Sequence, residues 1–307
     1  MSSSYPFVMP QTVLITGCSS GVGRVAAHRF LADGWTVYAT ARDAGALTEL
    51  GDAGAQTAAL DVTKTDAVER VVERIVAEEG GLDCLVNNAG FGQMGPLEDI
   101  PVEKVRQQYD VNTFGPHRTM RAVLPHMRDR GSGTIINVTS VTDRYPVAGS
   151  GAYSGSKSAL ASATRSVRQE VADHGIDVVI VEPTAVATAF YDRVREELVD
   201  VDHDTAYTDL YEVLELLHTV KSGGPGIATP HDVADAMLEA ATSGHPKRRY
   251  EVGWPASLGT VISTVLPEPV QTKAMDAGVR IAASEPGKRA LQWWFAQTHR
   301  AKARGET

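Results

Sequence analysis

Several features that would point to a particular class of protein are scarce in this sequence. Two cysteines, Cys18 and Cys84, are too few for a disulfide framework, and we expect both to be reduced thiols in a cytoplasmic protein. No apolar run approaches the 18 residues of a membrane-spanning helix. The first residues carry no basic segment followed by a long apolar one, so we do not expect a signal peptide.

Basic residues are also fewer than acidic ones. The chain has 29 Lys and Arg against 38 Asp and Glu, a formal net charge of -9. Because binding to a phosphate backbone requires a basic face, nucleic acid is not an expected partner. The nine histidines are scattered without paired spacing, so no metal site is predicted.

What the chain does contain is an alternation of short apolar runs with longer helical patterns. Helical patterns follow the glycine-rich turn at 17–23 and cover 66–79, 102–130 and 152–173. The apolar, β-branched runs predict strands at 12–16, 35–40, 57–60, 82–86, 134–138, 177–181 and 248–252. This alternation predicts an α/β fold, a doubly wound parallel sheet of Rossmann type with helices on both faces. Ligands of such sheets bind beyond the carboxyl ends of the strands.

The same patterns suggest one domain with two appendages. Residues 1–10 are expected to be an N-terminal arm, residues 11–252 a Rossmann-type domain, and residues 253–307 a C-terminal extension. With 43% hydrophobic residues, the chain has ample material for a core.

A glycine-rich turn follows the first predicted strand. It reads Gly17-Cys18-Ser19-Ser20-Gly21-Val22-Gly23 and leads directly into a helical pattern. Glycines let a backbone approach a pyrophosphate closely, and a helix N-terminus offers free N–H groups and positive potential. The order of strand, turn and helix therefore favours a dinucleotide loop, although an ordinary glycine-rich turn is the alternative.

The second predicted strand ends near Ala41-Arg42-Asp43, where a Rossmann fold contacts the adenosine ribose. An acid at this point binds the 2′-hydroxyl of NAD, whereas an arginine accommodates the 2′-phosphate of NADP. Arg42 favours NADP(H) over NAD(H). Asp43 could be the ribose acid, or it could cap the helix that begins near Ala44.

Tyr153 and Lys157 are four residues apart, which places both side chains on one face of a helix. A tyrosine keeps its proton up to a pKa of about 10 in water. A neighbouring ammonium group favours the phenolate and lowers this pKa. The pair is therefore a candidate acid/base centre, and a solvated helix face is the alternative.

Together these motifs resemble the short-chain dehydrogenase/reductase family over roughly residues 11–250. Five features carry the resemblance: Thr16-Gly17-x-x-x-Gly21-x-Gly23, Asn87-Asn88-Ala89-Gly90, Asn112 in the long helical pattern, Ser140 thirteen residues before the tyrosine, and Tyr153-x-x-x-Lys157. Within the family, the glycine turn and the segment 37–43 are similar to the 17β-hydroxysteroid and retinol dehydrogenase branch. The resemblance implies hydride transfer between a nicotinamide cofactor and a secondary alcohol or its carbonyl.

The resemblance also implies residue roles. Tyr153 is the acid/base, Lys157 holds the nicotinamide ribose, Ser140 donates to the substrate oxygen, and Asn112 holds a water beside the lysine. It implies a cofactor site formed by Gly17, Ser19, Ser20, Gly21, Val22, Gly23, Arg42, Asp61, Val62, Asn88, Ala89, Gly90, Tyr153, Lys157, Pro183 and Thr188. Simpler alternatives exist: Ser140 and Asp61 could each cap a local turn, and Asn112 could be an exposed helix residue.

One departure from the family pattern lies in the loop after the sixth strand. The family often has Pro-Gly-x-x-x-Thr there, and this chain has Thr184 in place of the glycine, between Pro183 and Thr188. The substitution puts the backbone geometry of this loop, and therefore the role of Thr188, in question.

Residues 188–226 correspond to the substrate lid of the family, and their apolar and aromatic residues predict a bulky, lipophilic substrate of steroid or retinoid type. For the extension we favour packing over the pocket mouth or at an oligomer interface, with contact to a membrane surface by its basic, aromatic end (Trp293-Trp294-Phe295) as the alternative. The family implies a homodimer or homotetramer. The competing functions are a non-catalytic dinucleotide-binding sensor and a 3-oxoacyl thioester reductase.

Overall fold

The computed structural model describes residues 11–199, 206–215, 227–253 and isolated positions between 270 and 290. Its centre is a seven-stranded sheet in which every pairing is parallel. The strands are β1 (Thr12–Thr16), β2 (Thr36–Ala41), β3 (Gln56–Ala59), β4 (Cys84–Asn87), β5 (Gly133–Val138), β6 (Ile176–Pro183) and β7 (Arg249–Val252). Each predicted strand is present, with ends displaced by at most two residues.

The strand order is β3-β2-β1-β4-β5-β6-β7. The chain therefore starts in the middle of the sheet, runs to one edge, and returns to β1 to build the other half. The loops after β1 and β4 leave the sheet in opposite directions, which opens a crevice at their carboxyl ends. This order confirms the predicted doubly wound fold.

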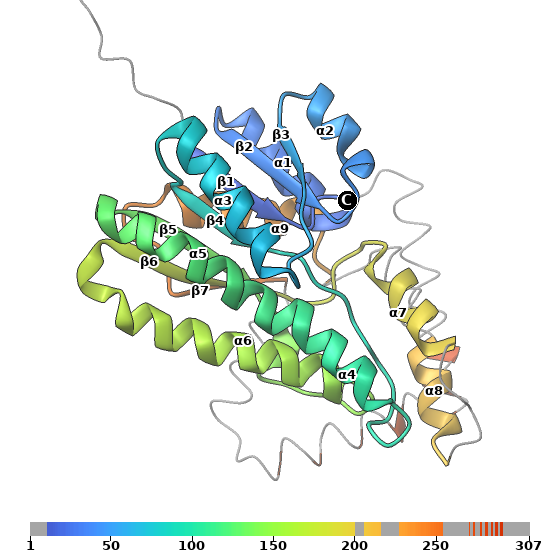
Figure 1. Ribbon diagram of the computed structural model, residues 1–307. Helices are drawn as coiled ribbons and strands as arrows, with labels where there is room; N and C mark the ends of the chain where they lie inside the picture. Colours follow the sequence, from blue (N-terminus) through green and yellow to red (C-terminus); the bar gives the residue numbers. More distant parts are fainter. Residues whose placement is uncertain are drawn as a thin grey trace, which may run out of the picture.

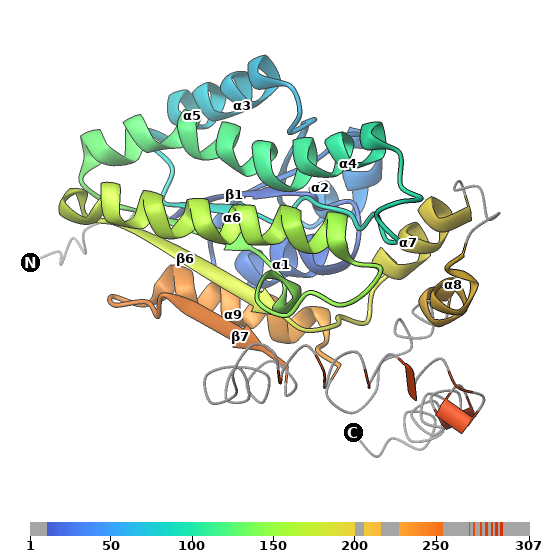
Figure 2. The same cartoon turned by 90° about the horizontal axis from the view of Figure 1, so that it is seen from below.

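Helices cover both faces of the sheet, as Figures 1 and 2 show. Helices α1 (Gly21–Ala32) and α9 (Pro230–Thr242) pack on one face, together with the short α2 (Thr48–Asp52). Helices α3 (Thr65–Glu79), α5 (Gly115–Arg130) and α6 (Gly151–Glu170) pack on the other. Because side chains alternate along a strand, Val13 packs in the hydrophobic core under α1 and α9, and its neighbour Leu14 packs in the core on the opposite face of the sheet.

The long helix predicted at 102–130 is interrupted. Helix α4 (Val102–Tyr109) passes into a π-helical turn (Asp110–Phe114) before α5 begins. Asn112 lies in this turn and is fully buried, since its side chain bonds to the backbone of Phe91. The alternative that Asn112 is an exposed helix residue is therefore wrong, and the interruption is of the kind that often accompanies functional sites.

Helices α7 (Phe190–Val199) and α8 (Thr208–Glu215) lie beyond the carboxyl ends of the strands and beside α4 (Figure 1). Their inner residues form a small apolar cluster with the loop after β4 and with α6. The cluster consists of Met94, Tyr153, Val194, Leu198, Tyr211 and Leu214. Of the predicted lid, residues 200–205 and 216–226 lie outside the described residues, as does Trp293-Trp294-Phe295 of the extension.

Within the described part of the chain, no helix combines the length and the hydrophobicity needed to cross a membrane.

A chain of buried polar side chains crosses the centre of the sheet. The Asn87 amide donates to Asn137 Oδ1 at 2.8 Å, and the Asn137 amide donates to the Thr164 hydroxyl of α6 at 2.9 Å. Thr119 of α5 donates to Asn87 Oδ1 at 2.6 Å. The exposed fractions of all four residues are at most 3%. Because buried polar groups without partners are costly, this network fixes α5 and α6 on β4 and β5.

Replacing Asn87 by Leu tests the cost of breaking this network. The change leaves the buried Asn137 Oδ1 without its donor and removes the Asn87 acceptor of the Thr119 hydroxyl, which keeps only backbone carbonyls of its own helix, so we expect the free energy of unfolding to fall by about 2 kcal/mol or more. Urea denaturation followed by circular dichroism measures it. Gln56→Leu on the exposed edge strand is the matched control, with an expected change within about 0.5 kcal/mol. Equal stabilities of the Asn87 variant and the parent would contradict the account.

Candidate active site

The glycine turn after β1 is shaped by contacts that leave no room for side chains. Gly17 has a φ of +77°, and a Cβ placed there would lie 2.8 Å from the Ala89 Cα in the loop after β4. A Cβ on Gly23 would collide with the Gly17 carbonyl and lie 2.5 Å from the Asn88 Nδ2. These two glycines are therefore required by close approach of backbone to backbone.

Asn88 and Thr16 fasten the two loops together. The Asn88 amide donates to the carbonyl oxygens of Thr16 at 3.0 Å and Gly17 at 3.2 Å. In return, the Thr16 hydroxyl accepts from the backbone N–H groups of Asn88 at 3.0 Å and Ala89 at 3.1 Å. The Asn-Asn-Ala-Gly motif thus holds the glycine turn in place, which sequence spacing alone did not reveal.

A cavity of about 620 Å³ opens in the crevice between these loops. Twelve of the predicted cofactor residues line it: Gly17, Ser19, Ser20, Gly21, Val22, Arg42, Asp61, Val62, Asn88, Ala89, Gly90 and Thr188. Gly23 lies under the turn instead, and Pro183 ends β6 away from the wall. The N-terminus of α1 begins at Gly21 on this wall, so the helix directs free N–H groups and positive potential into the cavity.

The adenosine end of the predicted site contains Arg42 and two acids with different local tasks. Asp43 caps the turn that follows β2, because its carboxylate accepts from the Gly45 N–H at 2.9 Å. Asp61 accepts from both the N–H and the hydroxyl of Thr63. Burial raises the pKa of Asp61, but these hydrogen bonds and the charges of Lys64 and Arg42 outweigh it and hold the pKa below its usual value. Arg42 and Asp61 line the cavity, and Asp43 does not.

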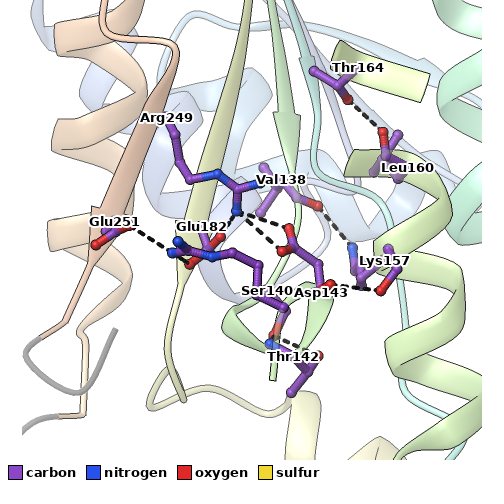
Figure 3. Close-up of polar contacts among 12 residues, drawn as sticks. Val138, Ser140, Thr142, Asp143, Lys157, Leu160, Thr164, Glu182, Arg249 and Glu251 are labelled. Atoms are coloured by element: carbon purple, nitrogen blue, oxygen red, sulfur yellow. Dashed lines mark hydrogen bonds and ion pairs between the residues drawn. The ribbon is translucent and has the colours of Figure 1, made fainter. Parts of the chain in front are cut away.

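The four residues predicted to be catalytic come together beside this cavity, although they do not form its wall. Tyr153 and Lys157 lie one turn apart on α6, and both are buried. Ser140 follows β5, and its hydroxyl is close enough to Tyr153 to lower the pKa of that phenol, while its Oγ accepts from the Thr142 N–H at 3.3 Å. The Lys157 ammonium donates to the Val138 carbonyl at 2.9 Å (Figure 3). Ser140 thus caps its loop and faces Tyr153 as well.

Gly90 and Asn112 connect the catalytic group to the cavity. A Cβ on Gly90 would lie 3.0 Å from the Asn112 Oδ1 and 3.5 Å from the Lys157 Nζ. The Asn112 amide donates to the Phe91 carbonyl at 2.9 Å and to the Ser156 hydroxyl at 3.2 Å. Because Gly90 has no side chain, the cavity wall at this residue lies directly against the side chains of Asn112 and Lys157.

The proton affinities of the pair differ from the sequence-based expectation. Burial raises the pKa of Tyr153 to about 12, the Ser140 hydroxyl opposes this rise, and the charge of Asp143 adds to it. Burial also lowers the pKa of Lys157 to about 8, against the charge of Asp143. The Lys157 Nζ is 5.9 Å from the centre of the Tyr153 ring. In the protein alone the desolvation of the phenol therefore dominates the Tyr153 pKa, and the expected lowering by Lys157 is not found.

The loop after β6 tolerates Thr184 in place of the family's glycine. The Thr184 N–H donates to the Val252 carbonyl at 2.9 Å, and its side chain fills the space beside Gly253. Gly253 has a φ of +103° and no side chain that could collide with Thr184. Thr188 reaches the cavity wall opposite Gly21, and its hydroxyl accepts from the Phe190 N–H at 3.3 Å. The loop therefore keeps Thr188 at the predicted place.

Several residues of the site carry no signal in the sequence. Phe190 lines the cavity, and its ring lies 5.7 Å from that of Tyr153. Arg193 and Glu197, one turn apart on α7, line the cavity and form an ion pair at 2.7 Å. Their contribution depends on where α7 docks, which local patterns do not specify. In the described part of the chain, no cluster of three or more His, Cys, Asp or Glu side chains could hold a metal ion.

The sequence model of the short chain dehydrogenase family matches residues 11–199. An uncharacterised oxidoreductase, YbbO of Escherichia coli K12, is 31% identical over 274 residues, which cover 87% of this chain and 95% of the relative. Human 17-beta-hydroxysteroid dehydrogenase type 1 is 34% identical, over 78% of this chain and 76% of the relative.

Solved structures of oxidoreductases also resemble this chain in fold. A short-chain dehydrogenase from Streptomyces avermitilis superposes with a TM-score of 0.72 at 31% identity, over 88% of this chain and 98% of the other. A serine dehydrogenase complexed with NADP+ has a TM-score of 0.69 at 29% identity, covering 80% and 95%. A short-chain dehydrogenase/reductase from Burkholderia phymatum in complex with NAD has a TM-score of 0.71 at 25% identity, covering 82% and 92%. The last two of these structures contain NADP+ and NAD, respectively.

Proposed function

The chain belongs to the short-chain dehydrogenase/reductase family of oxidoreductases that act on CH–OH groups, and we propose that it interconverts bulky, lipophilic secondary alcohols and ketones with NADP(H). The observation that carries the proposal is the position of Tyr153: buried, near the Ser140 hydroxyl, one turn from Lys157, and beside the glycine-lined cavity.

The residues of the cavity fit a nicotinamide dinucleotide. Gly17 and Gly21 bring the backbone to the wall without side chains, and the α1 N-terminus supplies N–H groups for a pyrophosphate. Asp61 would hold the adenine, and Lys157 the nicotinamide ribose. When bound, the cofactor supplies or accepts the hydride, and its oxidised ring carries a positive charge.

In ketone reduction the Tyr153 hydroxyl donates its proton to the carbonyl oxygen as negative charge develops there. The Ser140 hydroxyl donates a second hydrogen bond to the same oxygen. In alcohol oxidation Tyr153 takes the proton back, which requires the phenolate. The pKa of about 12 in the protein alone suits the acid direction. A positive charge beside the phenol favours the base direction, because it stabilises the phenolate.

Arg42 supports NADP(H) as the preferred cofactor. Its guanidinium stands on the cavity wall after β2, where it can form a fork of hydrogen bonds to a 2′-phosphate. The competing acid, Asp43, is engaged in capping the turn at Gly45 and does not line the cavity.

The surroundings of Tyr153 favour a lipophilic substrate. Met94 and Leu214 belong to the same apolar cluster as the tyrosine, and Phe190 packs against this cluster. A substrate that displaces or extends this cluster gains from apolar contact. The 17-beta-hydroxysteroid relative supports the same class, and α7 and α8 would act as the substrate lid.

We further infer a homodimer or homotetramer in the cytoplasm. Val102 of α4 and Phe114 of the π-helical turn are 59% and 51% exposed on the surface formed by the long helices, and burial in an interface would remove this apolar area from water. Both cysteines are buried free thiols, which fits a reducing compartment.

Replacing Tyr153 by Phe removes the acidic oxygen and keeps the ring. We expect turnover of a hydrophobic ketone with NADPH to fall at least about 100-fold, while NADPH binding persists. NADPH fluorescence decay and quenching measure the two quantities. Tyr38→Phe removes the same atom from a buried tyrosine on β2, which bonds to Glu78 and Glu79, and should keep turnover. Near-normal turnover of the Tyr153 variant would sink the assignment.

Replacing Arg42 by Gln tests the cofactor preference. Loss of a charged hydrogen-bond donor to the 2′-phosphate should weaken NADPH binding about tenfold or more and leave NADH binding unchanged. Fluorescence titration with both cofactors checks this. The matched control is Arg70→Gln on α3, where the guanidinium pairs with Asp66 on the exposed surface. Equal losses for NADH and NADPH would show that Arg42 does not select the phosphate.

A further inference from the structure

Behind Ser140 lies an ionic cluster that the reaction outlined above does not use. Three carboxylates and two guanidinium groups meet where the turn after β5 packs against the ends of β6 and β7 (Figure 3). The residues of this cluster are Asp143, Arg144, Glu182, Arg249 and Glu251. Glu182 is fully buried and the Asp143 side chain is 1% exposed. Carboxylates this deep are retained only when cations compensate them.

Arg249 is the centre of the cluster. From β7 its Nη1 donates to both carboxylate oxygens of Asp143, at 3.1 and 3.2 Å, and it also forms an ion pair with Glu182 at the end of β6. Arg144 pairs with the other side of Glu182 and reaches Glu251 at 2.7 Å. The cluster therefore joins the turn after β5 to the last two strands of the sheet.

Asp143 also belongs to the active-site turn. Its N–H donates to the Ser140 carbonyl at 2.8 Å, and its own carbonyl accepts from the Ser158 hydroxyl of α6 at 2.8 Å. Its carboxylate lies between Arg249 and Lys157 (Figure 3). This negative charge raises the pKa of Lys157 and of Tyr153.

We propose that Arg249 is a positioning residue for proton transfer: it holds and neutralises the Asp143 carboxylate behind Ser140, and so sets the electrostatic potential at the Tyr153–Lys157 pair. The inference rests on the proposed acid/base function of Tyr153. Its consequence is that a residue on the last strand, in direct contact with neither Tyr153 nor Lys157, controls the pH at which the pair works.

The charges around the pair define the direction of each effect. Tyr153 and Lys157 on α6 face Asp143, and Tyr191 of α7 faces Tyr153. Arg249 faces Asp143 from β7, and its own surroundings include Glu182, Arg144 and Arg165. Without the Asp143 charge, both Tyr153 and Lys157 release their protons at lower pH. Without the Arg249 charge, the uncompensated carboxylate makes both groups retain their protons to higher pH.

The test is the pH dependence of alcohol oxidation with NADP+, which requires the Tyr153 phenolate. Relative to the parent, Asp143→Asn should move the midpoint of the kcat/KM profile down, and Arg249→Gln should move it up, each by roughly one pH unit or less. In the Asp143→Asn background, Arg249→Gln should have little further effect, because the effect of Arg249 is transmitted by Asp143. A purely structural role would lower the rate in both variants without shifting the midpoints in opposite directions.

Two further variants serve as controls. Arg249→Lys keeps the cation and should return the midpoint close to that of the parent. Arg248→Gln removes an equal charge from the exposed neighbour and should leave the midpoint unchanged. If Arg249→Gln does not fold, Asp143→Asn, which is nearly isosteric, decides the question alone, with thermal unfolding and NADPH binding as checks on its integrity.

An unshifted midpoint in Asp143→Asn, or shifts of the same sign in the Asp143→Asn and Arg249→Gln variants, would overturn the inference. These results are distinguishable from failure of the proposed function. If the proposed function fails, the parent does not oxidise lipophilic alcohols, or Tyr153→Phe retains activity. If only the inference about Arg249 fails, the parent and the tyrosine variant behave as expected, and only the pH profiles of the Asp143 and Arg249 variants do not.

Discussion

The contact between the loop after β1 and the loop after β4 is the constraint on which the site depends. Gly17 lies against the Ala89 backbone, and Thr16 and Asn88 exchange hydrogen bonds across the junction. Two parallel strands whose connections diverge would otherwise leave these loops independent. Their union forms the cavity, aims the α1 N-terminus into it, and places Gly90 over Asn112 and Lys157. The same contact between the two loops therefore positions both the cofactor-binding wall of the cavity and the catalytic residues.

Burial decides the electrostatics of the catalytic group. It raises the pKa of Tyr153 and lowers that of Lys157, because desolvation disfavours the charged form of each group. Ser140 opposes the first shift, and Asp143 favours protonation of both groups. A buried carboxylate near a proton-transfer centre must itself be compensated, which connects the chemistry on α6 to Arg249 on the last strand.

Sequence patterns predicted the strands and the doubly wound order because alternating burial and glycine turns are local properties. Helical spacing also predicted Tyr153 and Lys157 as neighbours, and the family resemblance added Ser140 to them. They did not predict the π-helical turn at Asn112 or the role of Asn88 in fastening the glycine turn, since both depend on partners far along the chain. Lys157 was expected to lower the Tyr153 pKa, but burial reverses the shift. The Asp143–Arg249 pair spans 106 residues and could be found only in three dimensions.

The central claim is that Tyr153 moves the proton while the cofactor moves the hydride. The most direct measurement is mass spectrometry of the alcohol formed from a hydrophobic ketone and NADPH deuterated at the transferring carbon. The account predicts one deuterium per turnover on the carbinol carbon with the parent protein, and a loss of labelled product in Tyr153→Phe that parallels its loss of turnover. Unlabelled alcohol from the parent, or labelled alcohol formed equally fast by the tyrosine variant, would contradict it.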